Sequence, residues 1–286
     1  DVYKRQMIYT QQKELHSLME TLKNQGKTIG LVPTMGALHD GHLSLIKKAK
    51  KENDIAVVSI FVNPTQFNNP TDLEKYPRTL TADADKIAQY SKEVIIFAPT
   101  VDDIYGKEVV AQPFDFAGLD KVMEGSSRPG HFDGVGTIVK KLFEIVMPDR
   151  AYFGEKDYQQ LLIIQQMVRQ TGLPVTIVPC PIVRNSEGLA LSSRNALLSE
   201  ATTQRASFIY RTLLAAKEHF ATHTPAEVEA WVVDTFAKEP DFTLEYFTIT
   251  DAHTLQHITT KEADKEYRAF IVVYAEGVRL IDNLAM

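Results

Sequence analysis

The feature that most constrains the fold is a series of short, almost entirely apolar runs along the first two-thirds of the chain. These runs are rich in Ile, Val and Phe and show no polar alternation: Thr28–Val32, Ile55–Val62, Val94–Phe97, Ala151–Phe153 and Val175–Val178. Continuous apolar runs are typical of parallel strands covered on both faces. Stretches with helical spacing of apolar residues lie between them and predict helices over Gln11–Gln25, Leu43–Lys51, Thr81–Ser91, Val135–Val146 and Tyr158–Gln170. The alternation predicts an α/β fold with a Rossmann-like, doubly wound parallel sheet.

The pattern changes after about Val183. Two helix-like runs, Ala201–Phe220 and Ala226–Ala237, precede two strand-like runs, Leu244–Thr250 and Arg268–Glu276. Partial period-2 alternation in the first of these strands suits a half-exposed position in a sheet. We therefore expect residues 1–182 to form the parallel-sheet domain and residues 183–286 to form a second, smaller α+β domain.

Composition excludes some classes of function. A chain of 286 residues can bury one large core or two modest ones. Its net charge of −6 argues against a general nucleic-acid binder, although Lys156, Arg128 and Arg194 could still gather around a phosphate. No apolar run approaches the ~20 residues that span a bilayer, and no signal peptide is recognisable, so no membrane partner is expected. The single cysteine, Cys180, fits a reducing compartment, and we expect a cytoplasmic protein.

The first six residues, Asp1–Gln6, look foreign to the fold. They match the translation of a common sequencing adapter, so we expect Met7 to be the natural start and residues 1–6 to be a non-native extension.

Two histidines stand where the strand over Thr28–Val32 passes into the helix predicted from Leu43: His39 and His42, with Gly41 between them. The first N–H groups of a helix lack intrahelical partners and carry partial positive charge, so phosphate docks there readily. The glycine leaves room for its approach, and both imidazoles can donate to phosphate oxygens. This arrangement predicts a site for a nucleotide α-phosphate. Two capping histidines, or a zinc site that lacks a convincing third ligand, are the alternatives.

Two neutral amides, Asn63 and Gln66, follow the next buried strand, with Pro64 between them. Asn-Pro commonly serves a turn, which is the ordinary interpretation. The functional interpretation is that the amides hydrogen-bond a small polar hydroxy acid without desolvating another charge.

Three further segments carry groups suited to phosphates or amino acids. Glu124–Phe132 predicts a loop before a helix, and Gly154–Asp157 places Lys156 at another strand-to-helix junction. Ser192–Arg194 lies where the first domain passes into the second, and such a hydroxyl and guanidinium loop can fold over a triphosphate. A solvated loop, a surface lysine and a polar connector are the respective alternatives.

These segments together resemble one known family. The longer string Pro33–His42 contains the HxGH pattern of the nucleotidyltransferase superfamily, and it is similar to the pantothenate synthetase family. Five more blocks match that family in order, over about Met7 to Asn283: Phe61–Phe67, Tyr76–Thr79, Glu124–Phe132, Gly154–Gln160 and Leu189–Asn195. Thr65 departs from the pattern, because the family usually carries Met or Leu there.

The resemblance implies an ATP-dependent ligase that condenses pantoate with β-alanine through a pantoyl adenylate and releases AMP and pyrophosphate. It implies catalytic roles for His39, His42, Lys156 and Arg194. It implies that ATP is bound by Met35, His39, Gly41, His42, Gly154, Lys156, Asp157, Ser192, Ser193 and Arg194. It places pantoate at Thr34, Met35, Asn63, Gln66 and Gln160, and β-alanine near Glu124 and Arg128. In this scheme residues 1–182 bind nucleotide and pantoate, and residues 183–286 form a lid.

The same resemblance implies a homodimer through the first domain. It also implies that Mg²⁺ is held mainly by the ATP phosphates, without protein ligands. Two other functions stay open at this point. Another HxGH nucleotidyltransferase would act on a phosphate acceptor and release no AMP, and a catalytically inactive nucleotide-binding or scaffold protein would bind ATP without turnover.

Overall fold

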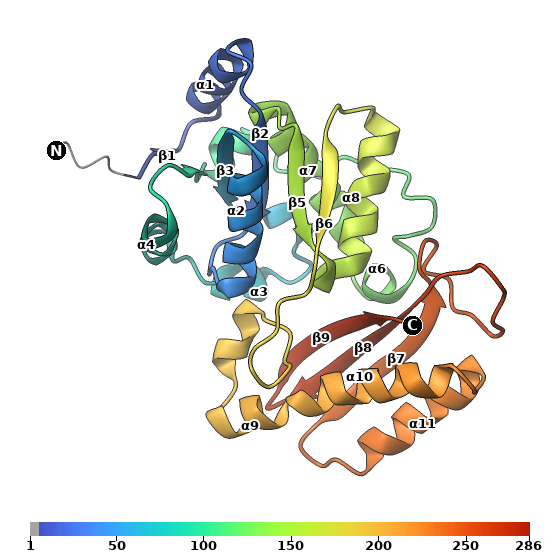
Figure 1. The fold of residues 1–286 in the computed structure, drawn as a ribbon. Coiled ribbons are helices and arrows are strands. Elements are labelled where there is room, and N and C mark those ends of the chain that lie inside the picture. The colour runs from blue at the N-terminus through green and yellow to red at the C-terminus, as the bar shows by residue number, and fades with distance from the viewer. Residues whose placement is uncertain (1–5) are drawn as a thin grey trace. The chain divides into compact units, whose positions relative to one another are not determined.

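The computed structural model describes residues 6–286, and the contacts within the chain divide it into two units at Pro181/Ile182 (Figure 1). The first unit holds a parallel sheet with helices, and the second holds a small antiparallel sheet, which confirms the predicted fold class. The predicted non-native extension lies outside the described residues except for Gln6, whose side-chain amide donates to the Val94 carbonyl. None of the helices formed by residues 6–286 is long and apolar enough to cross a membrane.

The six-stranded sheet of the first unit has the strand order β1-β4-β3-β2-β5-β6, and all its pairs are parallel. Its strands are β1 Ile8–Tyr9, β2 Ile29–Thr34, β3 Ile55–Ile60, β4 Ile95–Phe97, β5 Arg150–Gly154 and β6 Thr176–Cys180. Its helices are α1 Gln12–Asn24, α2 Asp40–Glu52, α3 Pro70–Lys75, α4 Leu80–Tyr90, α5 Val101–Tyr105, α6 Met123–Ser127, α7 His131–Val146 and α8 Tyr158–Thr171. The chain passes outward from β2 through β3 to β4 and then returns to β5 beside β2, so the winding direction reverses between β2 and β5.

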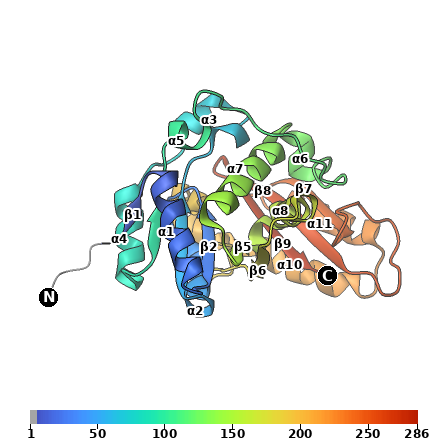
Figure 2. The same cartoon turned by 90° about the horizontal axis from the view of Figure 1, so that it is seen from above.

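Helices cover both faces of this sheet (Figure 2). On one face, Ile46 of α2 and Ile87 of α4 pack with Val32, Val58 and Ile96 of three adjacent strands in one buried cluster. Helices α7 and α8 lie on the other face. Because the inner strands β2, β3, β4 and β5 are covered on both faces, their sequences are apolar without alternation.

Three local predictions need correction. Helix α2 begins at Asp40 rather than Leu43, because His39 caps it and the motif itself forms the first turn. The segment Glu124–Phe132 is not a simple loop, since it contains α6 and the start of α7. Strand β1 was not predicted, because only two residues pair with β4.

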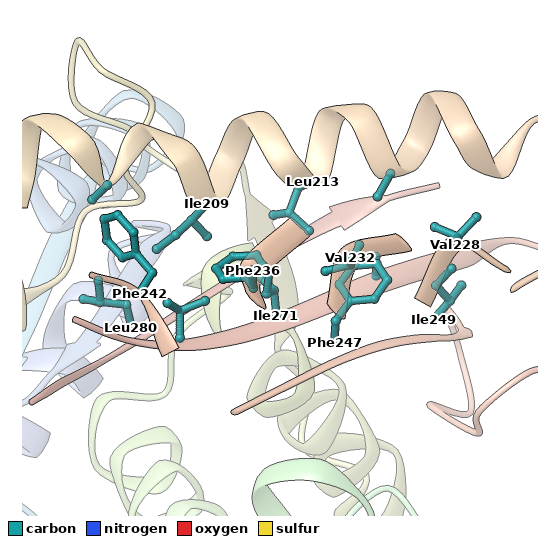
Figure 3. Packing of buried hydrophobic residues seen from close by; sticks show 14 of the residues in the cluster. Ile209, Leu213, Val228, Val232, Phe236, Phe242, Phe247, Ile249, Ile271 and Leu280 are labelled. Carbon is teal, nitrogen blue, oxygen red and sulfur yellow. The ribbon is translucent and has the colours of Figure 1, made fainter. Parts of the chain in front are cut away.

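The second unit packs two helices on a three-stranded antiparallel sheet of order β7-β8-β9 (Figure 3). Its elements are α9 Glu200–Arg205, α10 Ser207–Phe220, α11 Pro225–Ala237, β7 Thr243–Asp251, β8 Tyr267–Ala275 and β9 Val278–Ala285. Leu213 of α10 and Val232 and Phe236 of α11 meet Ile271 of β8 in the buried core. The predicted single helix Ala201–Phe220 is wrong, because the chain turns at the fully buried Ala206 with no Gly or Pro to mark the break.

A buried ion pair ties the beginning of the second unit to its last strand. Arg184 donates to both carboxylate oxygens of Asp282, at 2.6 and 2.9 Å, and its guanidinium lies 3.6 Å from the centre of the Tyr210 ring. The two side chains are 15% and 4% exposed. Arg184 also pairs with Ala190 in an isolated antiparallel bridge, so this ion pair fixes the turn that leads to Ser192.

We expect Asp282→Ala to lower the unfolding free energy by about 3 kcal/mol, because it leaves the Arg184 charge buried without its partner. Urea unfolding followed by fluorescence measures this change in the second unit, since the only tryptophan, Trp231, packs against its core. Glu266→Ala is the control, because it removes an exposed partner of His253 and should cost about 0.5 kcal/mol or less. Equal losses in both variants would contradict the role given to the buried pair.

Candidate active site

The winding reversal between β2 and β5 places two strand ends side by side. The motif that contains His39 and His42 follows β2, and Gly154–Asp157 follows β5. In open α/β sheets, ligands bind in the crevice outside the carboxyl ends of strands where the winding reverses. The structure therefore brings together the two predicted phosphate-binding segments of the first unit at one place.

The first turn of α2 is capped by the two histidines reciprocally. The backbone N–H of Gly41 donates to Nδ1 of His39 at 3.0 Å, and the backbone N–H of His39 donates to Nδ1 of His42 at 3.2 Å. An imidazole nitrogen that accepts a hydrogen bond carries no proton, so each neutral ring has its proton on Nε2. The two histidines therefore cap the helix, as the alternative interpretation predicts, and they do so through their Nδ1 atoms. The caps do not use the Nε2–H groups, which can donate to a ligand.

The surroundings keep both rings neutral. Burial lowers the pKa of His39 to about 4, helped by the ammonium groups of Lys156 and Lys86. Burial lowers the pKa of His42 to about 3, helped by His39 and then by the same two lysines. The ring centres lie 4.1 Å apart, so protonation of one ring opposes protonation of the other. At neutral pH the site offers uncharged donors beside lysine charges.

Gly154 and Lys156 lie at the end of β5, where the Lys156 charge acts on His39. Gly154 has an ordinary extended backbone (φ −75°), and a Cβ added there would meet no protein atom within 4 Å. Nothing within the described chain therefore requires glycine at this position. Lys156 lies in the short 3-10 helix η2 (Glu155–Asp157), 3.8 Å from a carboxylate oxygen of Asp157.

The two predicted amides lie at the end of β3. The side-chain N–H₂ of Asn63 donates to Oε1 of Gln66 at 3.0 Å and to the carbonyl of Gly134 at 3.1 Å. This bond orients the Gln66 amide, whose nitrogen faces Sδ of Met35 at 3.4 Å. Gln66 therefore presents N–H donors beside the motif after β2. A Cβ at Gly134 would come within 2.4 Å of the Thr65 carbonyl, so only glycine permits α7 to approach this closely.

Tyr105 and His131, to which the sequence assigned no role, complete this network together with Thr65. The Tyr105 hydroxyl donates to Oδ1 of Asn63 at 2.6 Å, and the Thr65 hydroxyl lies 3.1 Å from the same atom. His131 is buried, which lowers its pKa to about 4, and its Nδ1 lies 2.8 Å from the Gln66 carbonyl. Threonine at position 65 thus joins a polar network, and its tyrosine partner comes from α5, which carries no recognisable motif.

The remaining predicted residues of the first unit have distinct surroundings. Thr34 donates to the Ser59 carbonyl at 2.7 Å and so ties the end of β2 to β3. The half-buried Gln160 lies in the first turn of α8. Its neighbour Gln159 has a structural role, since it bonds the carbonyls of Leu119 and Val122.

The predicted β-alanine residues lie around α6. The Arg128 guanidinium is 3.9 Å from the Glu124 carboxylate. Residues of this segment, with Asp120 and Lys121, line a surface pocket of about 220 Å³.

Ser192, Ser193 and Arg194 lie in the second unit, in and before the 3-10 helix η3 (Ser193–Leu197). The Ser192 hydroxyl accepts from the backbone N–H of Arg194 at 3.1 Å, and Asn195 accepts from the backbone N–H of Ser192 at 2.7 Å. This reciprocal cap holds a compact turn where the sequence predicted a polar loop.

We predict that His39 and His42 stay neutral, with the proton on Nε2, from pH 8 down to about 5, because burial holds their pKa values at about 4 and about 3. Nitrogen shifts of ¹⁵N-histidine, assigned with single His→Gln variants, measure both properties. The unfolded chain binds these protons near the ordinary value of 6.5, so the unfolding free energy should fall as pH drops from about 6.5 towards 4.

The control is the same two histidines in urea-unfolded protein, whose pKa values should lie near the ordinary value of 6.5. A protonation midpoint near 6.5 in the native state, or a proton on Nδ1 of either ring, would contradict the capping geometry.

Comparison with known proteins gives a consistent result. The sequence model described as Pantoate-beta-alanine ligase matches residues 7–285. The pantothenate synthetase of Christiangramia forsetii is 50% identical over 279 residues, covering 98% of this chain and 99% of that protein. The pantothenate synthetase of Phocaeicola vulgatus is 54% identical over 274 residues, covering 95% and 96%.

Solved structures agree in fold. Pantothenate synthetase from Thermus thermophilus superposes with a TM-score of 0.85 at 39% identity, covering 97% of this chain and 98% of that one. The ligase from Francisella tularensis, solved with beta-gamma ATP and beta-alanine, gives a TM-score of 0.78 at 39% identity, covering 98% and 97%.

Proposed function

The chain belongs to the Pantoate-beta-alanine ligase family and is an enzyme that joins pantoate to β-alanine with ATP; we propose that the reaction passes through a pantoyl adenylate formed beside the ends of β2 and β5. The observation that carries this proposal is the pair of neutral Nε2–H donors, fixed by the caps of α2, next to Lys156.

In the first step, a carboxylate oxygen of pantoate attacks the α-phosphorus of ATP, and the bond from that phosphorus to the pyrophosphate oxygen breaks. His39 and His42 donate from Nε2 to phosphate oxygens as charge develops on them, and Lys156 stabilises the same charge. Donors that are already oriented need little reorganisation during the reaction, which makes them effective. Met35, Gly41, Gly154 and Asp157 line the nucleotide side.

Pantoate is held by amides rather than by a cation. The Gln66 amide, oriented by Asn63, donates to the carboxylate, and Gln160 binds the hydroxyl side, while Thr34 and Met35 complete the wall. An amide binds the carboxylate without pairing its charge, so the oxygen remains nucleophilic. Holding pantoate and ATP in the right position and orientation then makes the main contribution to the rate.

In the second step, β-alanine first loses its ammonium proton to solvent, and the neutral amine attacks the acyl carbon of the adenylate. The bond from that carbon to the AMP oxygen breaks, and the nitrogen releases a second proton as the amide forms. Glu124 and Arg128 offer opposite charges for a zwitterionic amino acid. Residues 183–286 act as a lid. The phosphates that leave as pyrophosphate are bound by its residues Ser192, Ser193 and Arg194. Residues 1–182 carry nucleotide and pantoate.

Mg²⁺ enters as part of the Mg-ATP substrate. The family resemblance implies that phosphate oxygens are its main ligands. We further propose that the protein is a homodimer formed through the first unit, as the family resemblance implies. We also propose that the enzyme is cytoplasmic, since ATP is its substrate. Light scattering on the purified protein tests the dimer.

The two alternative functions are less favoured. A nucleotidyltransferase that acts on a phosphate acceptor would need a further cation where this chain has Gln66 and Gln160. An inactive scaffold would have no need for the arrangement of His39, His42 and Lys156.

The function is tested by following AMP and pyrophosphate from Mg-ATP while pantoate and β-alanine are omitted in turn. AMP should require both substrates, whereas pantoate alone should support exchange of pyrophosphate into ATP. Pyrophosphate without AMP would identify another acceptor, and ATP binding without turnover would identify a scaffold.

His39→Asn separates capping from catalysis. Asparagine is a good N-cap, so it should preserve the acceptor for Gly41 and the melting temperature, while it removes the Nε2–H donor. We expect pantoate-dependent exchange to fall about 100-fold or more, as for other lost charge-stabilising donors. His39→Ala is the comparison, because it should lose both exchange and helix stability. Near-wild-type exchange in His39→Asn would remove this histidine from the mechanism.

Gly154→Ala tests whether this glycine leaves room for a ligand. The variant should fold with unchanged stability, because the added Cβ meets no protein atom within 4 Å. We expect the KM for ATP to rise about 10-fold, equivalent to about 1.4 kcal/mol. The control is Gly26→Ala, which is remote from the site and equally open but has φ +76°, so it should lose stability and keep its KM. An unchanged KM in Gly154→Ala would place the nucleotide elsewhere.

A further inference from the structure

The segment that joins β2 to His39 has an unusual backbone. Gly36 has φ +84° and Ala37 has φ +50°, so two consecutive residues are left-handed and one of them carries a side chain. Such a conformation persists only when its surroundings determine it. Since His39 follows two residues after Ala37, whatever holds this segment also sets the position of the imidazole.

Helix α4 supplies that restraint through a buried carboxylate. Asp83 is 3% exposed, and its two oxygens accept from the backbone N–H groups of Ala37 at 3.0 Å and of Leu38 at 2.9 Å. The Thr79 hydroxyl donates to the same carboxylate at 3.0 Å. A buried carboxylate is costly unless it is hydrogen-bonded, so these three bonds explain how the charge is tolerated.

Lys86 holds the same segment from its other side. Its ammonium donates to the carbonyl of Leu38 at 2.9 Å, and it lies three residues after Asp83, on the same face of α4. The N–H and the C=O of Leu38 are therefore both bound by one helix. Lys86 also adds to the positive potential at both histidines.

We propose that Asp83 and Lys86 are positioning residues of the ATP site: together they fix the left-handed segment so that the Nε2–H groups of His39 and His42 meet the α-phosphate. This inference rests on the proposed function, because it assigns the segment a role in adenylation. Neither residue touches the reacting atoms in this account. A misplacement of about 1 Å at such a site can cost about 100-fold in rate.

Substitutions at Lys86 test the proposal. Lys86→Met should lower the kcat of pantoate-dependent ATP–pyrophosphate exchange about 10-fold or more. The KM for pantoate should stay within about twofold, because the Asn63–Gln66 hydrogen bond that orients the amide lies outside this segment. Lys86→Arg restores a donor to the Leu38 carbonyl and should recover kcat to within about threefold. A melting temperature within about 2 °C of wild type shows that the effect is local.

Asp83→Asn should lower the kcat of exchange more than Lys86→Met does. One carboxylate oxygen that accepts from Ala37 or Leu38 becomes an N–H₂ group that faces a backbone N–H. The matched control is Asp85→Asn, an exposed carboxylate on the same helix, which should keep wild-type kinetics. If Asp83→Asn fails to fold, the comparison of Lys86→Met with Lys86→Arg still tests the proposal.

Wild-type kcat in Lys86→Met, or a loss that Lys86→Arg does not restore, would overturn the proposal. Absence of pantoate-dependent exchange in the wild-type enzyme would instead overturn the proposed function, so the two failures are distinguishable.

Discussion

Two hydrogen bonds at the start of α2 determine what the site can do. The N–H groups of Gly41 and His39 would be unpaired at a helix terminus, and they are satisfied by the Nδ1 atoms of His39 and His42. The same bonds fix the tautomer and orientation of both rings, so Nε2–H donors are ready for an anion before it arrives. Stability of the helix and chemistry of the site thus depend on the same atoms.

Different residues supply the positive charge of the site and the amide that is proposed to bind the acid. Burial keeps the imidazoles neutral, so the positive charge beside the two rings comes from Lys156 and Lys86. On the proposed pantoate side, Tyr105 donates to Asn63 and Asn63 donates to Gln66, so uncharged groups orient the Gln66 amide. In the proposed mechanism, a carboxylate bound in this way keeps its negative charge and attacks a phosphate that the histidines hold. The parallel sheet makes this possible, because it brings the ends of β2, β3 and β5 to one edge.

Much of the fold and part of the site follow from the sequence. The buried strands were predicted closely because short, continuous runs of Ile, Val and Phe are typical of strands covered on both faces, and the histidine motif was recognised from its place after β2. Long-range polar contacts were not predictable. Asp83 looks like a solvated helix residue, yet it binds backbone groups 45 and 46 residues earlier. Strand β9 was missed because its buried Asp282 interrupts the apolar pattern, and the charge of that aspartate is paired by Arg184, 98 residues earlier. The start of α2 was misplaced because histidine is not a common cap.

In the proposed reaction, this site lets a carboxylate attack the α-phosphorus of ATP. Pantoate labelled with ¹⁸O in both carboxylate oxygens tests it directly, with mass spectrometry of the AMP and the amide product. Attack at the α-phosphorus, followed by cleavage of the acyl carbon–oxygen bond, places one labelled oxygen in AMP and leaves the other in the amide carbonyl. AMP without label, or label in pyrophosphate or inorganic phosphate, would contradict the account.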